Sequence, residues 1–372
     1  MTDVVIVGAG VMGSATAYYL ASRGFNVTLL EQNRVGGIPG ASGASGSMLQ
    51  ALSGEGDAVE RQGQQSRAIF KELARELYEL SGVDIGYTEP GTIVLAFSEE
   101  GIAQINGRRV AAYVRNDEPH EWMDPRQIRT MEPAVSETAM AGLYLPKSQN
   151  VYAPQYVRAL AHSAAARGAT LLQGVSVTGV GRSGGRVTGV QTSQGHIACD
   201  ALVLASGAWT GLASRWLDLS LPVGPQRGQI MALQSRPPQR RVRHILHGHS
   251  GYLIPKANGT TVIGATHDAV GFDARVTGAG LQWLMNAGTR MVPELAEATF
   301  KHAWLGFRPI MEDGGLPIVG RLPGVENAYV AAGHGAIGVT VSPAVGQSLA
   351  ALIAGDPSAA DTLTPFDPAR YE

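Results

Sequence analysis

The chain has 372 residues, of which 48 are glycine, and its formal net charge is −2 at pH 7. An apolar content of 44 % with 16 % charged residues excludes a disordered chain, because it provides ample surface to bury. The near-neutral charge excludes a general nucleic-acid binder. The single cysteine, Cys199, excludes an intramolecular disulfide and a cysteine zinc cluster.

The length favours two lobes rather than one core. The N-terminus lacks the basic leader of a targeting segment, and the sequence contains no run of about 18 uninterrupted apolar residues. We therefore expect a cytoplasmic protein without a membrane span.

The chain is expected to begin with a β-α-β unit. Residues 4–7 read as a buried parallel strand, because they are apolar and β-branched without alternation. Residues 11–23 read as a helix that ends at Gly24, and residues 27–31 read as the second strand. The glycine- and serine-rich run 36–47 predicts a loop.

The rest of the chain mixes helices with strands of two kinds. A long helix is expected over 59–80, with Ile69, Leu73, Leu77 and Leu80 on one face, and the proline-containing stretch 98–152 is expected to be irregular. The other expected elements are strands 91–97, 175–180, 187–191, 201–204, 251–255, 261–264 and 328–332, helices 155–167 and 281–291, and a last helix that Ser342-Pro343 opens and Gly355 ends. Unbroken apolar strands lie at the start, middle and end of the chain, with antiparallel-looking ones between them. This order predicts a nucleotide-binding lobe built from separated segments, with a second lobe inserted.

A dinucleotide-binding motif follows the first strand. In Gly8-Ala9-Gly10-Val11-Met12-Gly13 the first glycine permits a tight turn, the second lets the backbone approach a pyrophosphate, and the third lets helix and strand pack closely. The helix N-terminus attracts phosphate, and Glu31 is placed to accept hydrogen bonds from a ribose. Glu31 does not separate NAD from FAD. The loop 36–47 either wraps a large cofactor or is a flexible linker.

Several further segments, in order and spacing, resemble the D-amino-acid oxidase (DAO) family of FAD-dependent oxidoreductases over essentially the whole chain. Within that family the sequence is most similar to bacterial glycine oxidases and to the related amine and imino-acid dehydrogenases. The segments that carry the resemblance are 5–10, 80–85, 95–100, Ala205-Ser206-Gly207-Ala208-Trp209, 262–266, Gly306-Phe307-Arg308-Pro309 and Ala332-Gly333-His334-Gly335 followed by Ser342-Pro343.

The resemblance implies an α/β fold, with a Rossmann-type FAD-binding domain built from discontinuous segments and an inserted antiparallel-sheet substrate domain. The FAD-binding domain would comprise residues 1–80, 151–220 and 305–372, and the substrate-binding domain residues 81–150 and 221–304. FAD would be held non-covalently, since Cys199 enters a buried strand. The expected cofactor-binding residues are Gly8, Gly10, Val11, Met12, Gly13, Glu31, Gln32, Ser42, Gly46, Ser47, Met48, Val177, Gly207, Gly333, His334, Gly335, Ile337, Gly338, Val339 and Thr340.

Arg308 is the leading substrate residue. A guanidinium grips a carboxylate with two hydrogen bonds and stays charged at any working pH, and the resemblance places it over the flavin; the alternative is a surface arginine beside a proline. Tyr252 either closes the same pocket or is a core tyrosine, and Met48 forms pocket wall. Ala336 stands where glycine oxidases have an arginine, and the loop 40–47 is longer, so the pocket is expected to be roomier or less polar.

The function expected from the resemblance is oxidative deamination of glycine, sarcosine or a small D-amino acid by hydride transfer to flavin, which gives an imino or keto acid and, with oxygen, hydrogen peroxide. The alternative is the catalytic subunit of an amino-acid or imino-acid dehydrogenase, acting on D-proline for example, that passes electrons to a partner protein. No catalytic base is assigned, and His334 is expected to orient its loop. A homo-oligomer is expected.

Two other clusters, one of histidines and one of arginines, are interpreted as ordinary structural or surface features. His244, His247 and His249 have metal-like spacing, but no carboxylate or cysteine is near in sequence, so no metal site is expected. The basic run from Arg236 to Arg243 is interpreted as a solvated loop, with a contact to a partner subunit as the alternative.

Overall fold

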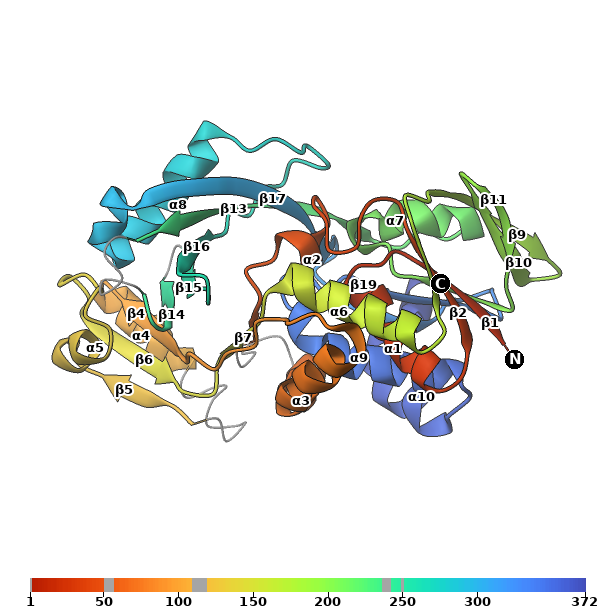
Figure 1. The fold of residues 1–372 in the computed structure, drawn as a ribbon, viewed down its shortest axis with the longest axis horizontal. Coiled ribbons are helices and arrows are strands. Elements are labelled where there is room, and N and C mark those ends of the chain that lie inside the picture. Colours follow the sequence, from red (N-terminus) through yellow and green to blue (C-terminus); the bar gives the residue numbers. More distant parts are fainter. Residues whose placement is uncertain (1, 50–56, 109–118, 236–241, 249–250) are drawn as a thin grey trace.

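Two large sheets organise the chain in the computed structural model, which describes residues 2–49, 57–108, 119–235, 242–248 and 251–372. Figure 1 shows them as two lobes side by side, with the long strands β13 and β17 running from one lobe toward the other. The first lobe holds a six-stranded sheet and the second an eight-stranded sheet.

The six-stranded sheet has the order β18-β19-β12-β1-β2-β8, parallel except for the edge strand β18. The β-α-β unit predicted at the start of the chain supplies its centre. Its strands are β1 (Asp3–Val7), β2 (Asn26–Glu31), β8 (Thr170–Gln173), β12 (Ala201–Leu204), β18 (Ile318–Arg321) and β19 (Ala328–Ala332).

Both faces of this sheet are covered, which explains why its strands are apolar without alternation. In β1, Val4 and Ile6 face a core shared with the helices, whereas Val5 and Val7 face a second core beneath a three-stranded antiparallel sheet. The helices are α1 (Val11–Ser22), α3 (Asp57–Ser81), α6 (Ala153–Ala166) and α9 (Gly338–Ile353), and the strands of the small sheet are β9 (Val177–Ser183), β10 (Arg186–Thr192) and β11 (Gly195–Ala198).

The eight-stranded sheet is antiparallel except for one parallel pair, β14 with β4. The helix α8 (Gly278–Met291) packs on it. The predicted domain boundary at residue 305 falls inside its longest strand, β17. In sheet order the strands are β17 (Thr299–Met311), β13 (Val223–Gln234), β16 (Thr260–Gly264), β15 (Gly251–Pro255), β14 (Ile245–Gly248), β4 (Thr92–Ala96), β6 (Ala141–Leu145) and β5 (Glu121–Met123).

Short elements fill the remainder of the described chain. A two-stranded pair joins β3 (Met48–Leu49) to β7 (Gln149–Asn150). The short helices are α2 (Ala41–Ala44), α4 (Glu99–Arg108), α5 (Pro125–Met131), α7 (Thr210–Ala213) and α10 (Pro357–Leu363), and the 3-10 turns are Gly207–Trp209, Ser214–Leu217, Pro293–Glu297, Thr364–Phe366 and Pro368–Tyr371.

Three sequence-based expectations about these elements were wrong. The stretch 98–152 is not irregular: it holds α4, β5, α5, β6 and β7, and Asp124 and Pro125 begin α5 with a capping box. The buried face of α3 includes Phe70 rather than the half-exposed Ile69. The helix expected to open at Ser342-Pro343 is α9, which starts at Gly338 and is followed by α10, so Pro343 lies inside it. The Ser342 hydroxyl donates to the Val339 carbonyl that the proline leaves without its helical donor.

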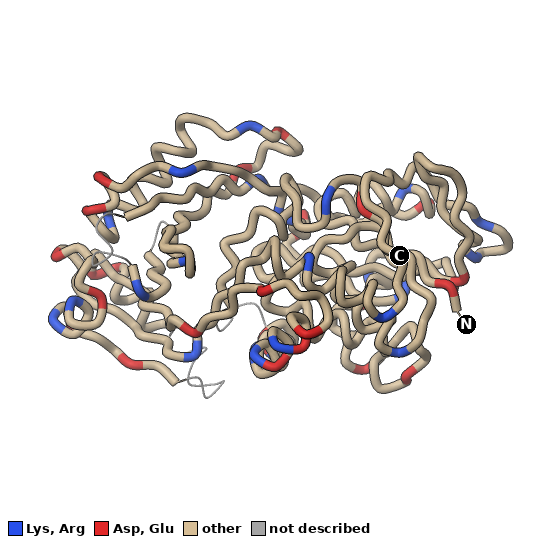
Figure 2. The backbone as a smooth tube through the Cα atoms, viewed as in Figure 1, with Lys and Arg blue, Asp and Glu red and all other residues tan. Residues whose placement is uncertain are grey.

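The surface charge carries no strong bias along the described chain. Figure 2 shows both signs scattered over both lobes, as the net charge of −2 implies. None of the described helices is long and apolar enough to cross a membrane.

The contact between α1 and α9 requires a glycine at position 346. A Cβ there would lie 2.8 Å from the Cβ of Ala15, closer than carbon atoms pack. We expect Gly346→Ala to lower the free energy of unfolding by about 1–3 kcal/mol, because overpacking outweighs alanine's better helix propensity. Denaturant unfolding measures this loss. Gly278→Ala in α8 is the matched control, since nothing lies within 4 Å of its Cβ position; equal losses in both variants would contradict the explanation.

Candidate active site

A cavity of about 900 Å³ lies between the two lobes. Its walls come from the turn between β1 and α1, the loop 31–48, the segment 205–213, the inner face of the eight-stranded sheet and the segment 334–340. Segments from the start, middle and end of the chain therefore meet at one site.

The dinucleotide motif forms one end of this cavity. The two carboxylate oxygens of Glu31 accept hydrogen bonds from the backbone N–H groups of Ala9 (3.1 Å) and Asn33 (2.9 Å). The Ser42 hydroxyl accepts one from the N–H of Val11 (3.0 Å) and so caps α1. Glu31 and Ser42 therefore hold the glycine turn in shape as well as facing the cavity.

Most of the residues predicted to bind FAD line this cavity, and two do not. The position of a Cβ on Gly13 is occupied by the Gly8 carbonyl, so this glycine serves the close packing of helix and strand. Gly333 packs against Met311. The predicted residues that line the cavity are Gly8, Gly10, Val11, Met12, Glu31, Gln32, Ser42, Gly46, Ser47, Met48, Val177, Gly207, His334, Gly335, Ile337, Gly338, Val339 and Thr340.

The glycine-rich loop is held in place by Lys256, which argues against the flexible-linker alternative. The Lys256 ammonium donates to the carbonyls of Gly46 (2.8 Å) and Val151 (2.9 Å) and to Oδ1 of Asn150 (2.8 Å). Burial lowers the pKa of Lys256 to about 7. Ser47, which follows Gly46 in the chain, has a positive φ of 67°, and its hydroxyl accepts a hydrogen bond from the Ala153 N–H. The wall of the cavity at 46–48 is thus tied to both lobes.

The start of α9 forms another wall, and His334 lies just before it. The true N-terminus of this helix, at Gly338 rather than Pro343, lies at the cavity, so its partial positive charge faces the site. His334 is 3 % exposed, and neither ring nitrogen has a hydrogen-bond partner within the described chain. Burial lowers its pKa to about 3, so the ring is neutral. A buried polar ring without partners on the wall of a cavity fits a bound group with polar atoms.

The opposite end of the cavity is the inner face of the eight-stranded sheet. Gly228 and Ile230 on β13, and Gly306 and Arg308 on β17, line it at the two-residue spacing of strands. A Cβ on Gly228 would lie 2.6 Å from the Arg308 guanidinium. Glycine at this position therefore lets the guanidinium lie flat across β13.

Arg308 carries a charge that the described protein does not neutralise. Its Nη1 donates to the carbonyl of Thr266 (2.9 Å), and it forms no ion pair with the carboxylates of the described residues. Burial lowers the pKa of Arg308, while Tyr252 and Asp268 act in the opposite direction. The remaining guanidinium N–H groups are therefore available to an anion in the cavity.

Tyr252, Met48 and Ala336 also line the cavity. Tyr252 packs with Met48 in one apolar cluster, and burial raises the pKa of its hydroxyl, with Arg308 opposing the shift. Ala336 is exposed. This arrangement gives an apolar wall on one side of Arg308 and an open, small side chain on another.

Among the residues on the sheet side of the cavity that the sequence analysis did not assign to the site are Ile230, His247, His267 and Trp283. His267 hydrogen bonds through Nδ1 to Oε1 of Gln226 (2.9 Å), and burial and Arg308 lower its pKa. The pairing of His247 with Tyr252 places both on one face of the sheet. The alternation of side chains along β13 would have predicted that Ile230 faces the cavity. The positions of His247, His267 and Trp283 depend on strand pairing or loop folding, which a single sequence does not reveal.

Of the described members of the histidine and arginine clusters, His247 lines the cavity, whereas His244 and Arg243 do not. Oε2 of Glu132 accepts from Nδ1 of His244 (3.1 Å), and no group of three potential metal ligands occurs among the described residues. His249, Arg236, Arg240 and Arg241 lie outside the described residues. Cys199 is buried in the core beneath the three-stranded sheet and is not part of the cavity wall.

Known proteins resemble this chain over its whole length. Glycine oxidase from Geobacillus kaustophilus is 35 % identical over 99 % of this chain and 97 % of its own. Hydrogen cyanide synthase subunit HcnC from Pseudomonas aeruginosa is 30 % identical over 100 % of this chain and 96 % of its own. A crystal structure of glycine oxidase from Geobacillus kaustophilus superimposes with a TM-score of 0.93, at 33 % identity, over 100 % of both chains.

The family model described as FAD dependent oxidoreductase (DAO) matches residues 3–352. That range includes the glycine turn, the loop 36–48, Arg308 and the start of α9, so the family's motifs coincide with the walls of the cavity. The chain belongs to the DAO family of FAD-dependent oxidoreductases.

Proposed function

We propose that this protein oxidises the Cα–N single bond of a small amino acid (glycine, sarcosine or a small D-amino acid) to the C=N bond of an imino acid, with hydride transfer to FAD. Water then hydrolyses the imino acid to a keto acid and releases ammonia or an amine. The observation that carries the proposal is the unneutralised Arg308 guanidinium at one end of a cavity whose other end is a dinucleotide motif. The similarity to glycine oxidase supports the substrate class.

In this proposal, residues 1–80, 151–220 and 305–372 form the FAD-binding domain, and residues 81–150 and 221–304 the substrate-binding domain. The cofactor is held by the glycine turn, Glu31, the loop 42–48 and the segment 334–340. Bound FAD supplies the electron acceptor for the Cα–H hydride. The protein supplies position: Arg308 fixes the carboxylate, and Met48 and Tyr252 exclude water from one side.

His334 is given a structural role rather than that of a base. A ring whose pKa burial lowers to about 3 is a poor proton acceptor at neutral pH. Its two unpartnered nitrogens suit a hydrogen bond to the cofactor instead. No protein base is required when the substrate amine enters in its neutral form.

A second candidate is the catalytic subunit of a dehydrogenase complex that passes electrons to a partner protein and acts on an amino acid or a cyclic imino acid. The full-length similarity to a protein named as a subunit of hydrogen cyanide synthase supports this second candidate. Assembly into a homo-oligomer and a cytoplasmic location stay predictions.

The two candidates differ in what reoxidises the flavin. We expect the yellow purified protein to be bleached without oxygen by one or more of glycine, sarcosine, D-alanine and D-proline. Rapid recovery of the colour in air, with hydrogen peroxide formed, identifies an oxidase. Slow recovery in air with fast recovery by an artificial electron acceptor identifies a dehydrogenase. Bleaching by no amino or imino acid would refute both.

Removing the Arg308 charge tests the carboxylate site. We expect Arg308→Met to lower kcat/KM for the best amino acid by about 30-fold or more, because losing one partner of a buried charge pair costs about 2 kcal/mol or more. Steady-state kinetics at matched flavin content measures this loss. Arg321→Met, at an exposed arginine on β18, is the control and should match the unchanged protein. An unaltered kcat/KM in Arg308→Met would dismiss the assigned role.

His334 is tested through FAD affinity. We expect His334→Leu to weaken FAD binding by about tenfold, the value of one hydrogen bond of about 1.4 kcal/mol. Fluorescence titration of the FAD-free protein measures the dissociation constant. His162→Leu replaces an exposed histidine on α6 and serves as the control. If both variants bind FAD as the unchanged protein does, the contact is wrong.

A further inference from the structure

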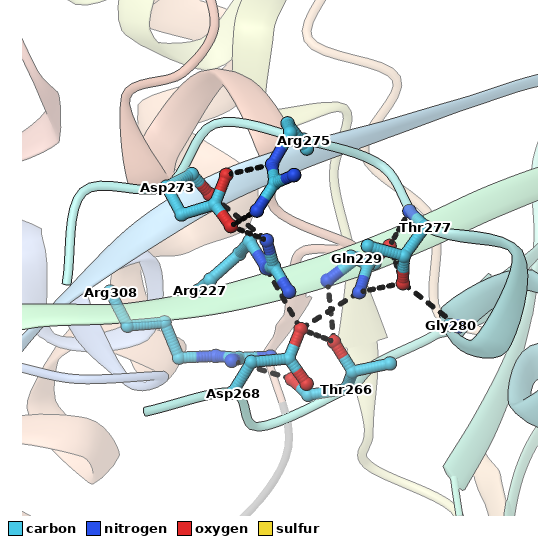
Figure 3. Close-up of polar contacts among 9 residues, drawn as sticks. All are labelled: Arg227, Gln229, Thr266, Asp268, Asp273, Arg275, Thr277, Gly280 and Arg308. Carbon is cyan, nitrogen blue, oxygen red and sulfur yellow. Dashed lines mark hydrogen bonds and ion pairs between the residues drawn. The ribbon is translucent and has the colours of Figure 1, made fainter. Parts of the chain in front are cut away.

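The segment that follows β16 carries the hydrogen-bond acceptor of Arg308. This acceptor is the backbone carbonyl of Thr266, and Figure 3 shows Arg308 reaching it from one side while a polar network holds the same segment from the other. The direction of the guanidinium therefore depends on where this carbonyl is fixed.

Asp268 is the centre of the network. A single oxygen, Oδ2, accepts hydrogen bonds from Nε of Arg227 (2.9 Å), Nε2 of Gln229 (2.8 Å) and the Thr266 hydroxyl (3.1 Å). Burial alone would raise the pKa of Asp268, but the hydrogen bonds from Gln229, Arg227 and Thr266 lower it below its usual range. The carboxylate is therefore ionised, and each of its three bonds is charge-assisted.

Gln229 ties both ends of the loop to β13. Its backbone N–H donates to the Thr266 hydroxyl (2.9 Å), and its carbonyl accepts from the Thr266 N–H (3.2 Å). Its side-chain Oε1 accepts from the N–H of Thr277 (2.7 Å), where α8 begins. Residues 266–277 thus form a loop whose two ends are bonded to one residue, Thr266 to the Gln229 backbone and Thr277 to the Gln229 side chain.

Burial makes this network rigid. Gln229 is 1 %, Arg227 5 % and Thr266 7 % exposed, so movement of the loop would leave buried polar groups without partners, at a cost of about 1–3 kcal/mol each. Arg227 also pairs with Asp273 (3.3 Å) farther along the loop. The Thr266 carbonyl is consequently held in one place before any ligand arrives.

We propose that Arg227, Gln229 and Asp268 are positioning residues that act through Thr266 to aim the Arg308 guanidinium at the substrate carboxylate. This inference rests on the proposed function, because it assumes that a carboxylate binds Arg308. Preorganised donors lose little entropy on binding, and an error of about 1 Å in placement weakens recognition strongly.

The loss of charge and the loss of positioning predict opposite changes in anion affinity for the variant Asp268→Ala. Asp268→Ala removes a negative charge near Arg308, so electrostatics alone would tighten binding of an anion. If the network acts by positioning, the same variant binds the anion more weakly, because Thr266 is released. Thr266→Val changes no charge, keeps the backbone carbonyl and removes the hydroxyl that donates to Asp268, so it tests position alone.

The experiment titrates the FAD-loaded protein with acetate and follows the flavin absorbance, with acetamide as the uncharged analogue. We expect Asp268→Ala and Thr266→Val to raise the acetate dissociation constant about tenfold, to leave that of acetamide unchanged, and to raise KM for the amino-acid substrate more than they lower kcat. Arg275→Met is the matched control: Arg275 also pairs with Asp273 (2.7 Å), but its side chain is 80 % exposed. It should behave as the unchanged protein.

The outcomes separate this inference from the proposed function. If acetate perturbs the unchanged protein and Arg308→Met abolishes that effect, but Asp268→Ala binds acetate equally or more tightly and Thr266→Val differs by less than twofold, the positioning role is wrong and the carboxylate site stands. If acetate does not bind the unchanged protein, the proposed function fails first. Should Asp268→Ala not fold, Thr266→Val decides.

Discussion

The constraint on which the site depends is the partly buried guanidinium of Arg308, which has no carboxylate partner among the described residues. Taking the Arg308 charge out of water is costly, and within the described chain it gains one carbonyl in return. The Thr266 carbonyl and the nearby Asp268, which favours the charged form, offset part of this cost. In the proposed function, the substrate carboxylate would supply the negative partner that Arg308 lacks among the described residues.

The two ends of the cavity are built by different physical means. At the dinucleotide end, the strand, the glycine turn and the helix N-terminus are contiguous in sequence, so a short motif is sufficient to form the turn. Glu31 and Ser42 then accept hydrogen bonds from backbone N–H groups of this motif. At the sheet end, no short segment is sufficient. Arg308, Gly228 and Thr266 come from three separate strands or loops, and only pairing of β13 with both β17 and β16 brings them together.

This difference explains what could be predicted from the sequence. The motif at 8–13 and the buried strand before it predict the β-α-β unit at the centre of the first lobe, because its strands, turn and helix are contiguous in sequence. Residues 98–152 were interpreted as irregular because prolines mark both loops and helix starts, and Pro125 begins α5. The same ambiguity applies to Pro343, which the sequence predicts as a helix start. In the structure it lies inside α9, and the Ser342 hydroxyl donates to the Val339 carbonyl that the proline leaves without a helical donor. His267 carries no sequence signal at all, since its place at the cavity depends on how 266–277 folds.

The separation of the dinucleotide end from the sheet end of the cavity also affects how substrate specificity can change within this fold. Ile230 of β13, His247 of β14 and Tyr252 of β15 line the cavity from neighbouring parts of the eight-stranded sheet. Replacing Ile230 or His247 would therefore reshape the substrate end without touching the glycine turn or α9. The network around Thr266 and Asp268 is anchored by Arg227 and Gln229, which alternate along β13 with the cavity-lining Gly228 and Ile230. If Arg308 binds the substrate carboxylate as proposed, changes at Ile230 or His247 would alter which substrate side chains fit while that contact is kept.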